Sequence, residues 1–257
     1  MAYQVTAQNH AEASENKIHE NTVAARYGFT GALVPGVAVY GYLTHEVVER
    51  FGEAWLSQST SEVRFLKPAY QGDKLTIIMK EQNEELLVEC HNQNGVLLAV
   101  LKTKTGPPTD SGFSFDQPPF QSEERTDLCW DNLQLDNSFT PFTWQLSPSE
   151  NLRYVNQVSD TLDIYSQGYL HPHLILSQAN TVLTRKFIMP AWIHVGSCIR
   201  VYEAIKQNDT VMVCAKPNKK WQTKGHDFVL LDLAYIVNGK TLVEIEHTAI
   251  FKIAEPA

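Results

Sequence analysis

The stretch Arg64-Phe-Leu-Lys-Pro-Ala-Tyr-Gln-Gly-Asp-Lys-Leu75 has a counterpart in Arg200-Val-Tyr-Glu-Ala-Ile-Lys-Gln-Asn-Asp-Thr-Val211. At a constant offset of 136 positions (64 to 200), the arginine, the glutamine and the aspartate are identical and apolar positions coincide. Near the end of each half, an Asn-Gly pair (94–95 and 238–239) lies between alternating apolar runs, which predicts a type I′ hairpin. The matches keep their order along the chain, so we predict two copies of one structural unit.

Each copy shows one helical segment followed by four β-type runs. In the first copy, apolar residues at helical spacing predict a helix over Val37–Phe51, with Pro35-Gly36 just before it. In the second copy, the predicted helix is Leu174–Phe187. The predicted strands are Glu62–Leu66, Lys74–Lys80, Leu86–His91, Val96–Thr103, Gly196–Tyr202, Thr210–Lys216, Asp227–Val237 and Lys240–Ile253. A long helix backed by an antiparallel sheet, used twice, is an α+β fold.

The segment between the copies changes in composition. Residues 105–125 contain four prolines together with several Ser, Asp and Gly residues, which is typical of a surface linker. We therefore predict an N-terminal repeat over residues 1–104, a linker over 105–125 and a C-terminal repeat over 126–257.

The composition excludes several classes of protein. A length of 257 residues with 43% hydrophobic and 19% charged residues is typical of a globular chain with a sizeable core. The formal charge of -8 argues against nucleic-acid binding, and no apolar run approaches the ~20 residues that cross a bilayer. The first residues lack a secretory signal pattern, so we expect a cytoplasmic protein.

The chain has four cysteines: Cys90, Cys129, Cys198 and Cys214. They show no Cys-x-x-Cys spacing, so we expect free thiols and no metal site.

The segment from Ser14 to Leu43 carries the candidate site. It places an Asn-x-x-His pair, Asn16 and His19, on a polar turn, followed by a glycine-rich approach to the helix that opens at Pro35-Gly36. An imidazole can act as a general base near neutral pH, and a helix N-terminus offers free N–H groups to a developing anion. This combination is suited to a thioester-linked acyl group. The alternative is that Asn16 and His19 only hydrogen-bond the turn and each other.

On these residues the chain resembles the MaoC-like, R-specific enoyl-CoA hydratase family in its double-hotdog form, in which a curved antiparallel sheet wraps each helix. The family motif is Asp-x-Asn-Pro-x-His, followed by His-Gly at the start of the central helix. Asn16 and His19 match the motif's Asn and His, and Gly36 matches its glycine. Ser14 stands where the catalytic Asp is expected, Lys17 replaces the proline, and Pro35 replaces the second His.

The resemblance implies a hydratase or dehydratase that interconverts enoyl and 3-hydroxyacyl thioesters, as in fatty acid or polyketide metabolism. His19 would be the base, Asn16 would position water, and the backbone N–H at Gly36 would bind the thioester oxygen. The substrate would be a thioester of coenzyme A or acyl carrier protein, with no further cofactor. Two alternatives remain open, and with them whether the chain is an enzyme: binding of an acyl thioester or a protein partner without turnover, and thioester hydrolysis.

The remaining candidates have a structural interpretation beside the functional one. Ser14 suits a turn or a helix N-cap as well as substrate contact, and Tyr40 suits core or tunnel lining. Lys219 and Lys220 belong to a basic cluster over residues 216–226 that suits either substrate phosphates or a solvated hairpin tip.

The second copy lacks the histidine of the motif. Its position falls on Tyr154 or Tyr165, depending on where the motif is taken to start. We interpret His171 and His173 as core or helix-start residues, because no third ligand lies at metal-binding spacing. A single site in the first copy is therefore expected, in a monomer or a homodimer.

Overall fold

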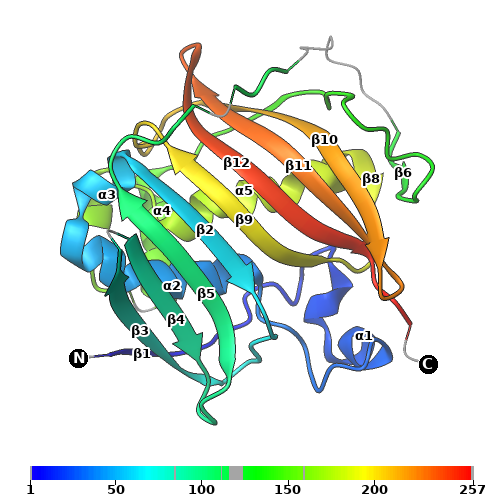
Figure 1. Cartoon of the computed structure of the whole chain (residues 1–257), viewed down its shortest axis with the longest axis horizontal. Coiled ribbons are helices and arrows are strands. Elements are labelled where there is room, and N and C mark those ends of the chain that lie inside the picture. The colour runs from blue at the N-terminus through cyan, green and yellow to red at the C-terminus, as the bar shows by residue number, and fades with distance from the viewer. Residues whose placement is uncertain (1, 84, 111, 116–123, 159, 256–257) are drawn as a thin grey trace.

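Ten strands form one continuous antiparallel sheet that extends across the whole molecule, with the long helices behind it (Figure 1). The computed structural model describes residues 2–83, 85–110, 112–115, 124–158 and 160–255. In spatial order, the strands are β1 (Tyr3–Thr6), β3 (Lys74–Gln82), β4 (Glu85–His91), β5 (Leu97–Thr105), β2 (Ser59–Phe65), β9 (Ile193–Val201), β12 (Lys240–Lys252), β11 (His226–Val237), β10 (Val211–Thr223) and β7 (Phe142–Trp144). The eight predicted strands are confirmed within a few residues at most ends, and the α+β class is confirmed with them.

Two hairpins differ from the prediction. Strand β10 runs seven residues past Lys216, through a register shift between Pro217 and Lys219, so the hairpin tip is Lys224-Gly225. The basic cluster over residues 216–226 therefore lies at the end of a hairpin, but Lys219 and Lys220 pair with β11 and do not belong to the turn itself.

The Asn-Gly pairs also differ from each other. Asn238 and Gly239 both have positive φ, as a type I′ turn requires, whereas at 94–95 only the glycine does. There the Asn92 side chain shapes the loop by accepting hydrogen bonds from the N–H groups of Asn94 and Val96, each at 3.0 Å. The type I′ prediction therefore holds only in the second half.

The two copies meet at the centre of the sheet, where β2 pairs with β9. The register places Glu62 opposite Cys198, and these are also equivalent residues at the offset of 136. A residue that pairs with its own counterpart marks an approximate two-fold axis.

The repeated turns agree with this relation. The Tyr70 N–H donates to the Asp73 carboxylate at 2.9 Å, and the Lys206 N–H donates to the Asp209 carboxylate at 2.7 Å. The isolated bridges Leu33↔Tyr70 and Tyr169↔Lys206 are also 136 positions apart.

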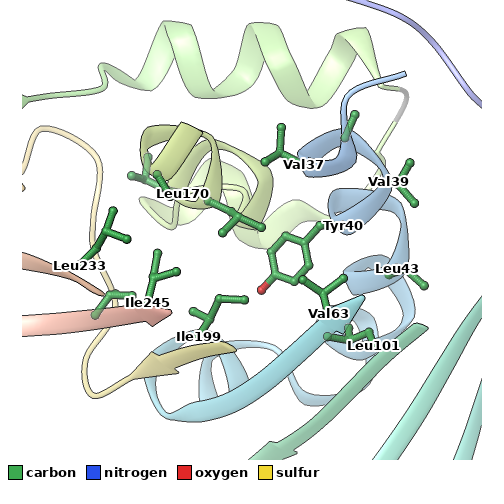
Figure 2. Close-up of a cluster of buried hydrophobic side chains, with 14 of the residues drawn as sticks. Val37, Val39, Tyr40, Leu43, Val63, Leu101, Leu170, Ile199, Leu233 and Ile245 are labelled. Carbon is green, nitrogen blue, oxygen red and sulfur yellow. The ribbon is translucent and has the colours of Figure 1, made fainter. Parts of the chain in front are cut away.

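The helices α2 (Gly36–Phe51) and α5 (Pro172–Lys186) lie side by side against the sheet. Most of α2 is buried around its whole circumference because it lies between the sheet and α5. Gly41 allows this close approach, since a Cβ there would lie 3.0 Å from the His171 ring. Figure 2 shows the resulting core, in which the Tyr40 ring of α2 points toward Val63 and Ile199 of the sheet. Each such side chain contributes about 1.5–3 kcal/mol when fully buried.

Helix α5 begins two residues earlier than predicted. Pro172 occupies its first turn, and the His171 ring caps it by accepting a hydrogen bond from the His173 N–H at 3.2 Å. The remaining short elements are η1 (Lys17–His19), α1 (Asn21–Arg26), α3 (Glu53–Ser57), β6 (Thr126–Asp127), α4 (Pro148–Gln157), η2 (Asp163–Gln167) and β8 (Phe187–Ile188).

Helix α4 was not predicted. Its start carries a capping box between Ser147 and Glu150, with Pro148 in the first turn. The sequence Ser-Pro-x-Glu was the local signal for it.

In the described residues, none of the helices has the length and apolar character that crossing a bilayer requires.

Candidate functional site

A cavity of about 200 Å³ lies at the N-terminal end of α2, where η1, β2, β9 and α5 come together. We call it the narrow cavity. Its wall is largely apolar: Ile18, Phe29, Leu33, Val34, Val39 and Phe65. Polar side chains enter from both halves of the chain: Asn16, His19, Asn180 and His194. An apolar cavity with a few converging polar groups is the usual form of a small-molecule site.

His19 is held in one tautomer by the backbone. Its Nδ1 lies 2.7 Å from the Leu33 carbonyl oxygen, which can only accept, so Nδ1 carries the proton. The lone pair on Nε2 has one long contact, at 3.4 Å, with the Asn16 amide nitrogen. Burial lowers the pKa of His19 below its ordinary value, against the smaller opposing effect of the Leu33 hydrogen bond. The imidazole is therefore neutral at neutral pH, with a basic nitrogen available.

Asn16 ties the first half to the second. Its side-chain oxygen accepts from the N–H groups of Ile18 and Trp192, and its amide nitrogen donates to the Trp192 carbonyl at 3.0 Å. These contacts use most of the hydrogen-bonding capacity of a buried amide. The N–H that remains lies near His19, so Asn16 orients the imidazole as well as the turn.

The start of α2 leaves N–H groups without acceptors. Pro35 gives no side-chain cap, and its carbonyl accepts only from Ala38 and Val39. In the described residues, the N–H groups of Gly36 and Val37 have no hydrogen-bond partner. Such groups carry the partial positive charge of the helix end and suit a carbonyl oxygen that becomes negative. A Cβ at Gly36 would lie 3.0 Å from the Phe65 ring, so a larger residue there would have to displace that ring.

A second, wider cavity of about 650 Å³ adjoins the first. We call it the wide cavity. The two share five lining residues: Asn16, His19, Pro35, Asn180 and Trp192. Its rim holds Arg185, Gln157 and an ion pair in which Arg125 contacts both carboxylate oxygens of Glu15. That arginine lowers the pKa of Glu15. Glu15 is the one carboxylate among the described residues that line either cavity, and it is already paired with Arg125.

Unpartnered polar atoms gather around these cavities. In the described part of the chain, five residues that line them each have a buried side-chain atom without a partner at hydrogen-bond geometry: Tyr154 Oη, His173 Nδ1, Asn180 Oδ1, Trp192 Nε1 and His194 Nδ1. Such atoms cost about 1–3 kcal/mol each unless a ligand or water satisfies them. Sequence patterns missed Asn180, Trp192 and His194, because these residues reach the site only through the packing of one half on the other.

The other predicted site residues lie in different places. Ser14 lines the wide cavity, and its hydroxyl donates to the Asn16 carbonyl at 3.3 Å. Tyr40 is 4% exposed in the core, lines neither cavity, and burial raises the pKa of its phenol above the usual value. The Lys220 ammonium donates to the carbonyls of Trp130 and Leu133, and Lys219 lies 5.7 Å from the Trp221 ring. Neither lysine lines the narrow or the wide cavity.

The second half holds a buried cluster of its own. Asp160 lies 3.3 Å from His171 Nε2 and 3.2 Å from His45 Nδ1, and it accepts a hydrogen bond from the Leu162 N–H. These partners hold the pKa of Asp160 well below its usual range despite the opposing effect of burial. His171 occupies the position equivalent to Pro35, at the start of α5. In the described residues, no group of three or more His, Cys, Asp or Glu side chains is arranged to hold a metal ion.

Comparison with solved structures identifies the fold. A candidate MaoC domain protein dehydratase from Chloroflexus aurantiacus superimposes on this chain with a TM-score of 0.67 at 10% sequence identity. The alignment covers 98% of this chain and 95% of that protein. A conserved Mycobacterium tuberculosis protein described as a double hotdog fold matches 97% and 94%, with a TM-score of 0.66 at 11% identity. A MaoC-like dehydratase matches 97% of each chain, with a TM-score of 0.60 at 12% identity.

The chain therefore has the double-hotdog fold of MaoC-like proteins, as the resemblance predicted. No protein-family model matches the sequence, and no curated protein matches it either. At these identities the similarity establishes the fold, and the activity has to be argued from the site.

Proposed function

We propose that this protein binds acyl thioesters and interconverts enoyl and 3-hydroxyacyl forms by adding or removing water. The observation that carries the proposal is the arrangement in the narrow cavity. A neutral imidazole, whose Nε2 makes only a long contact of 3.4 Å with Asn16, lies in the same apolar cavity as an uncapped helix N-terminus. The double-hotdog fold shared with proteins named as dehydratases supports it.

The proposed reaction needs a base for water, a proton for the α-carbon, and stabilisation of the enolate oxygen. In the hydration direction, His19 Nε2 removes a proton from water as the oxygen adds to the β-carbon. The electron pair of the double bond moves toward the thioester carbonyl, whose oxygen is held by the N–H groups of Gly36 and Val37. The His19 imidazolium then returns the proton to the α-carbon. Because one group both accepts and returns the proton, water adds to one face of the double bond.

The absence of a carboxylate beside His19 has a chemical consequence. The Leu33 carbonyl orients the ring but stabilises the imidazolium less than an aspartate would. We therefore propose a slower reaction than an Asp–His pair would give. Binding without turnover remains the competing proposal, and hydrolysis, with water held near His19, is the third.

One assay separates the three proposals. The protein is incubated with crotonyl-CoA and longer enoyl-CoAs while loss of the enoyl absorbance and release of free thiol are followed together. Loss of absorbance without thiol supports hydration, and thiol release supports hydrolysis. Binding of the CoA thioester with neither signal would contradict both enzymatic proposals and support binding alone.

A further inference from the structure

The narrow cavity has a second polar feature, on the wall formed by β9. His194 lines the cavity but is only 6% exposed, and its Nε2 lies 2.9 Å from the Ser197 hydroxyl. The same hydroxyl lies 3.1 Å from Nδ1 of His247, which belongs to the neighbouring strand β12. Ser197 therefore bridges two buried imidazoles, whose ring centroids are 4.2 Å apart.

This cluster is separate from the groups assigned to the reaction. The Phe65 ring packs against Gly36 and also makes an edge contact with the His194 ring, at 4.8 Å between centroids. Phe65 thus lies between the helix N-terminus, where the thioester is held in the proposed function, and the histidine. An acyl chain that extends past Phe65 would meet His194.

One nitrogen of this cluster is left without a partner. His194 Nδ1 meets hydrogen-bond geometry with none of the described residues, although the nearby Gly196 backbone partly offsets the effect of burial on the pKa of the ring. Burial lowers the pKa of His194 well below its usual value and that of His247 to about 3, so both rings are neutral. A neutral imidazole nitrogen in this position lacks only a ligand or a water.

The serine bridge allows this nitrogen two hydrogen-bonding states. If the Ser197 hydroxyl donates to His247, His194 Nε2 donates to Ser197 and its Nδ1 is an acceptor. If His247 donates to Ser197, the hydroxyl donates to His194 Nε2 and Nδ1 carries a proton that it can donate. A ligand hydroxyl suits the first state and a ligand carbonyl suits the second.

We infer that the narrow cavity selects acyl groups that carry an oxygen function, a hydroxyl or a carbonyl, on the chain beyond the thioester. His194 is the residue that recognises this oxygen, and Ser197 and His247 position it. This inference rests on the proposed function, since it assigns the substrate class of the same site.

The test compares N-acetylcysteamine thioesters that differ only in the distal oxygen. Saturated butanoyl to octanoyl thioesters are titrated against the intact chain by calorimetry, beside their terminal hydroxyl and penultimate keto analogues. The oxygenated ligand of best length is expected to bind about fivefold to tenfold more tightly than its hydrocarbon counterpart, as one added hydrogen bond gives.

Two variants and one control assign the preference to the cluster. His194→Phe replaces the imidazole with an apolar ring, and Ser197→Ala removes the bridge; each is expected to reduce the preference to less than about twofold. Ser61→Ala removes another buried hydroxyl, which hydrogen-bonds Thr103 and lines neither cavity, and is expected to keep the preference. Circular dichroism establishes which variants are folded, and the wild-type comparison needs no variant.

Each outcome decides a different point. Equal binding of hydrocarbon and oxygenated thioesters by the wild-type protein would overturn the inference and leave the proposed function standing. A preference that survives in both folded variants would also overturn it. If no thioester of either kind binds, the proposed function fails, and the inference fails with it.

Discussion

At the scale of single residues, His19 is oriented by a backbone carbonyl where a carboxylate was expected. The 2.7 Å contact with Leu33 fixes which nitrogen is basic, and burial keeps the ring neutral. A carbonyl has no full charge, so it leaves the pKa below the ordinary histidine value, whereas a carboxylate would raise it. The site therefore has a weaker base that is mostly deprotonated at neutral pH.

The pH dependence of the proposed hydration follows from this. The neutral ring is the active form, and its pKa lies below about 6.5, so the fraction of active enzyme changes little above neutrality. We predict that kcat/KM is flat from about pH 7 to about pH 8 and falls tenfold per pH unit once the pH drops below the pKa of His19. A profile for crotonyl-CoA hydration that rises toward acid would contradict a neutral His19 base.

Sequence patterns could locate the site residues that the first repeat contributes, but not those that the second repeat contributes. Asn16 and His19 are three positions apart, so a local motif was enough to pair them. The partner of Asn16 is Trp192, 176 positions away, and Asn180 and His194 also come from the second half. Contacts between residues so far apart in the sequence depend on how the two repeats pack, and no local sequence pattern predicts that packing.

At the scale of elements, the start of α2 combines two requirements. Its free N–H groups need an uncapped end, which Pro35 provides, and Phe65 needs a position without a Cβ, which Gly36 provides. The resemblance predicted that the backbone N–H of Gly36 binds the thioester oxygen. In the structure, the Phe65 ring occupies the space that a Cβ would need, so packing explains why this residue is glycine.

We predict that Gly36→Ala destabilises the protein by about 1–3 kcal/mol, because the added methyl group overpacks against Phe65. Urea unfolding measures the change. Gly31→Ala is the matched control, since its Cβ would meet its nearest neighbour at 3.5 Å, an ordinary contact. Equal stability of the two variants would show that Phe65 moves aside without cost.

Elements with a strong local signal were predicted well. The β-type runs and both long helices have clear periodicity, so their ends differ from the structure by few residues, apart from β10. Strand β10 was cut short because Lys219 and Lys220 suggested a solvated loop, whereas pairing with β11 carries the strand to Thr223. Tertiary pairing overrode a polar sequence there.

At the scale of the whole molecule, the fold buries several histidines in neutral form. Burial lowers the pKa of His173 and of His247 to about 3, and lowers those of His19, His171 and His194 as well. On unfolding, each ring returns to a pKa of about 6.5. Between about pH 3 and pH 6.5 the unfolded chain therefore binds more protons than the native protein.

Stability must then rise with pH across this range, because the unfolded state holds the extra protons. At pH ~5, His173 and His247 each contribute a slope of about 1.3 kcal/mol per pH unit, or about 2.6 kcal/mol per unit together. We predict that urea unfolding between about pH 4.5 and pH 6 gives a slope of at least about 2 kcal/mol per pH unit, and that His173→Phe, which preserves the stack on Tyr154, lowers it by about 1 kcal/mol per unit. A slope near zero would mean that these rings titrate normally in the native protein.

The repeat relation explains why only one half carries the proposed reactive site. The position of Pro35 is taken by His171 in the second copy, where the ring caps α5 and contacts Asp160 in the core. That copy uses its polar residues to hold the two helices together. The second half instead supplies Asn180, Trp192 and His194 to the cavities beside the first.

The most direct test of the central proposal is the effect of His19→Gln on crotonyl-CoA hydration and on CoA-thioester binding in the same preparation. Glutamine can still donate a hydrogen bond to the Leu33 carbonyl but cannot act as a base, and His91→Gln serves as a control outside both cavities. We predict that kcat/KM falls about 10²–10⁴-fold while the Kd for the thioester changes less than about threefold. A hydration rate in His19→Gln equal to that of the wild-type protein would contradict the assignment of His19 as the base.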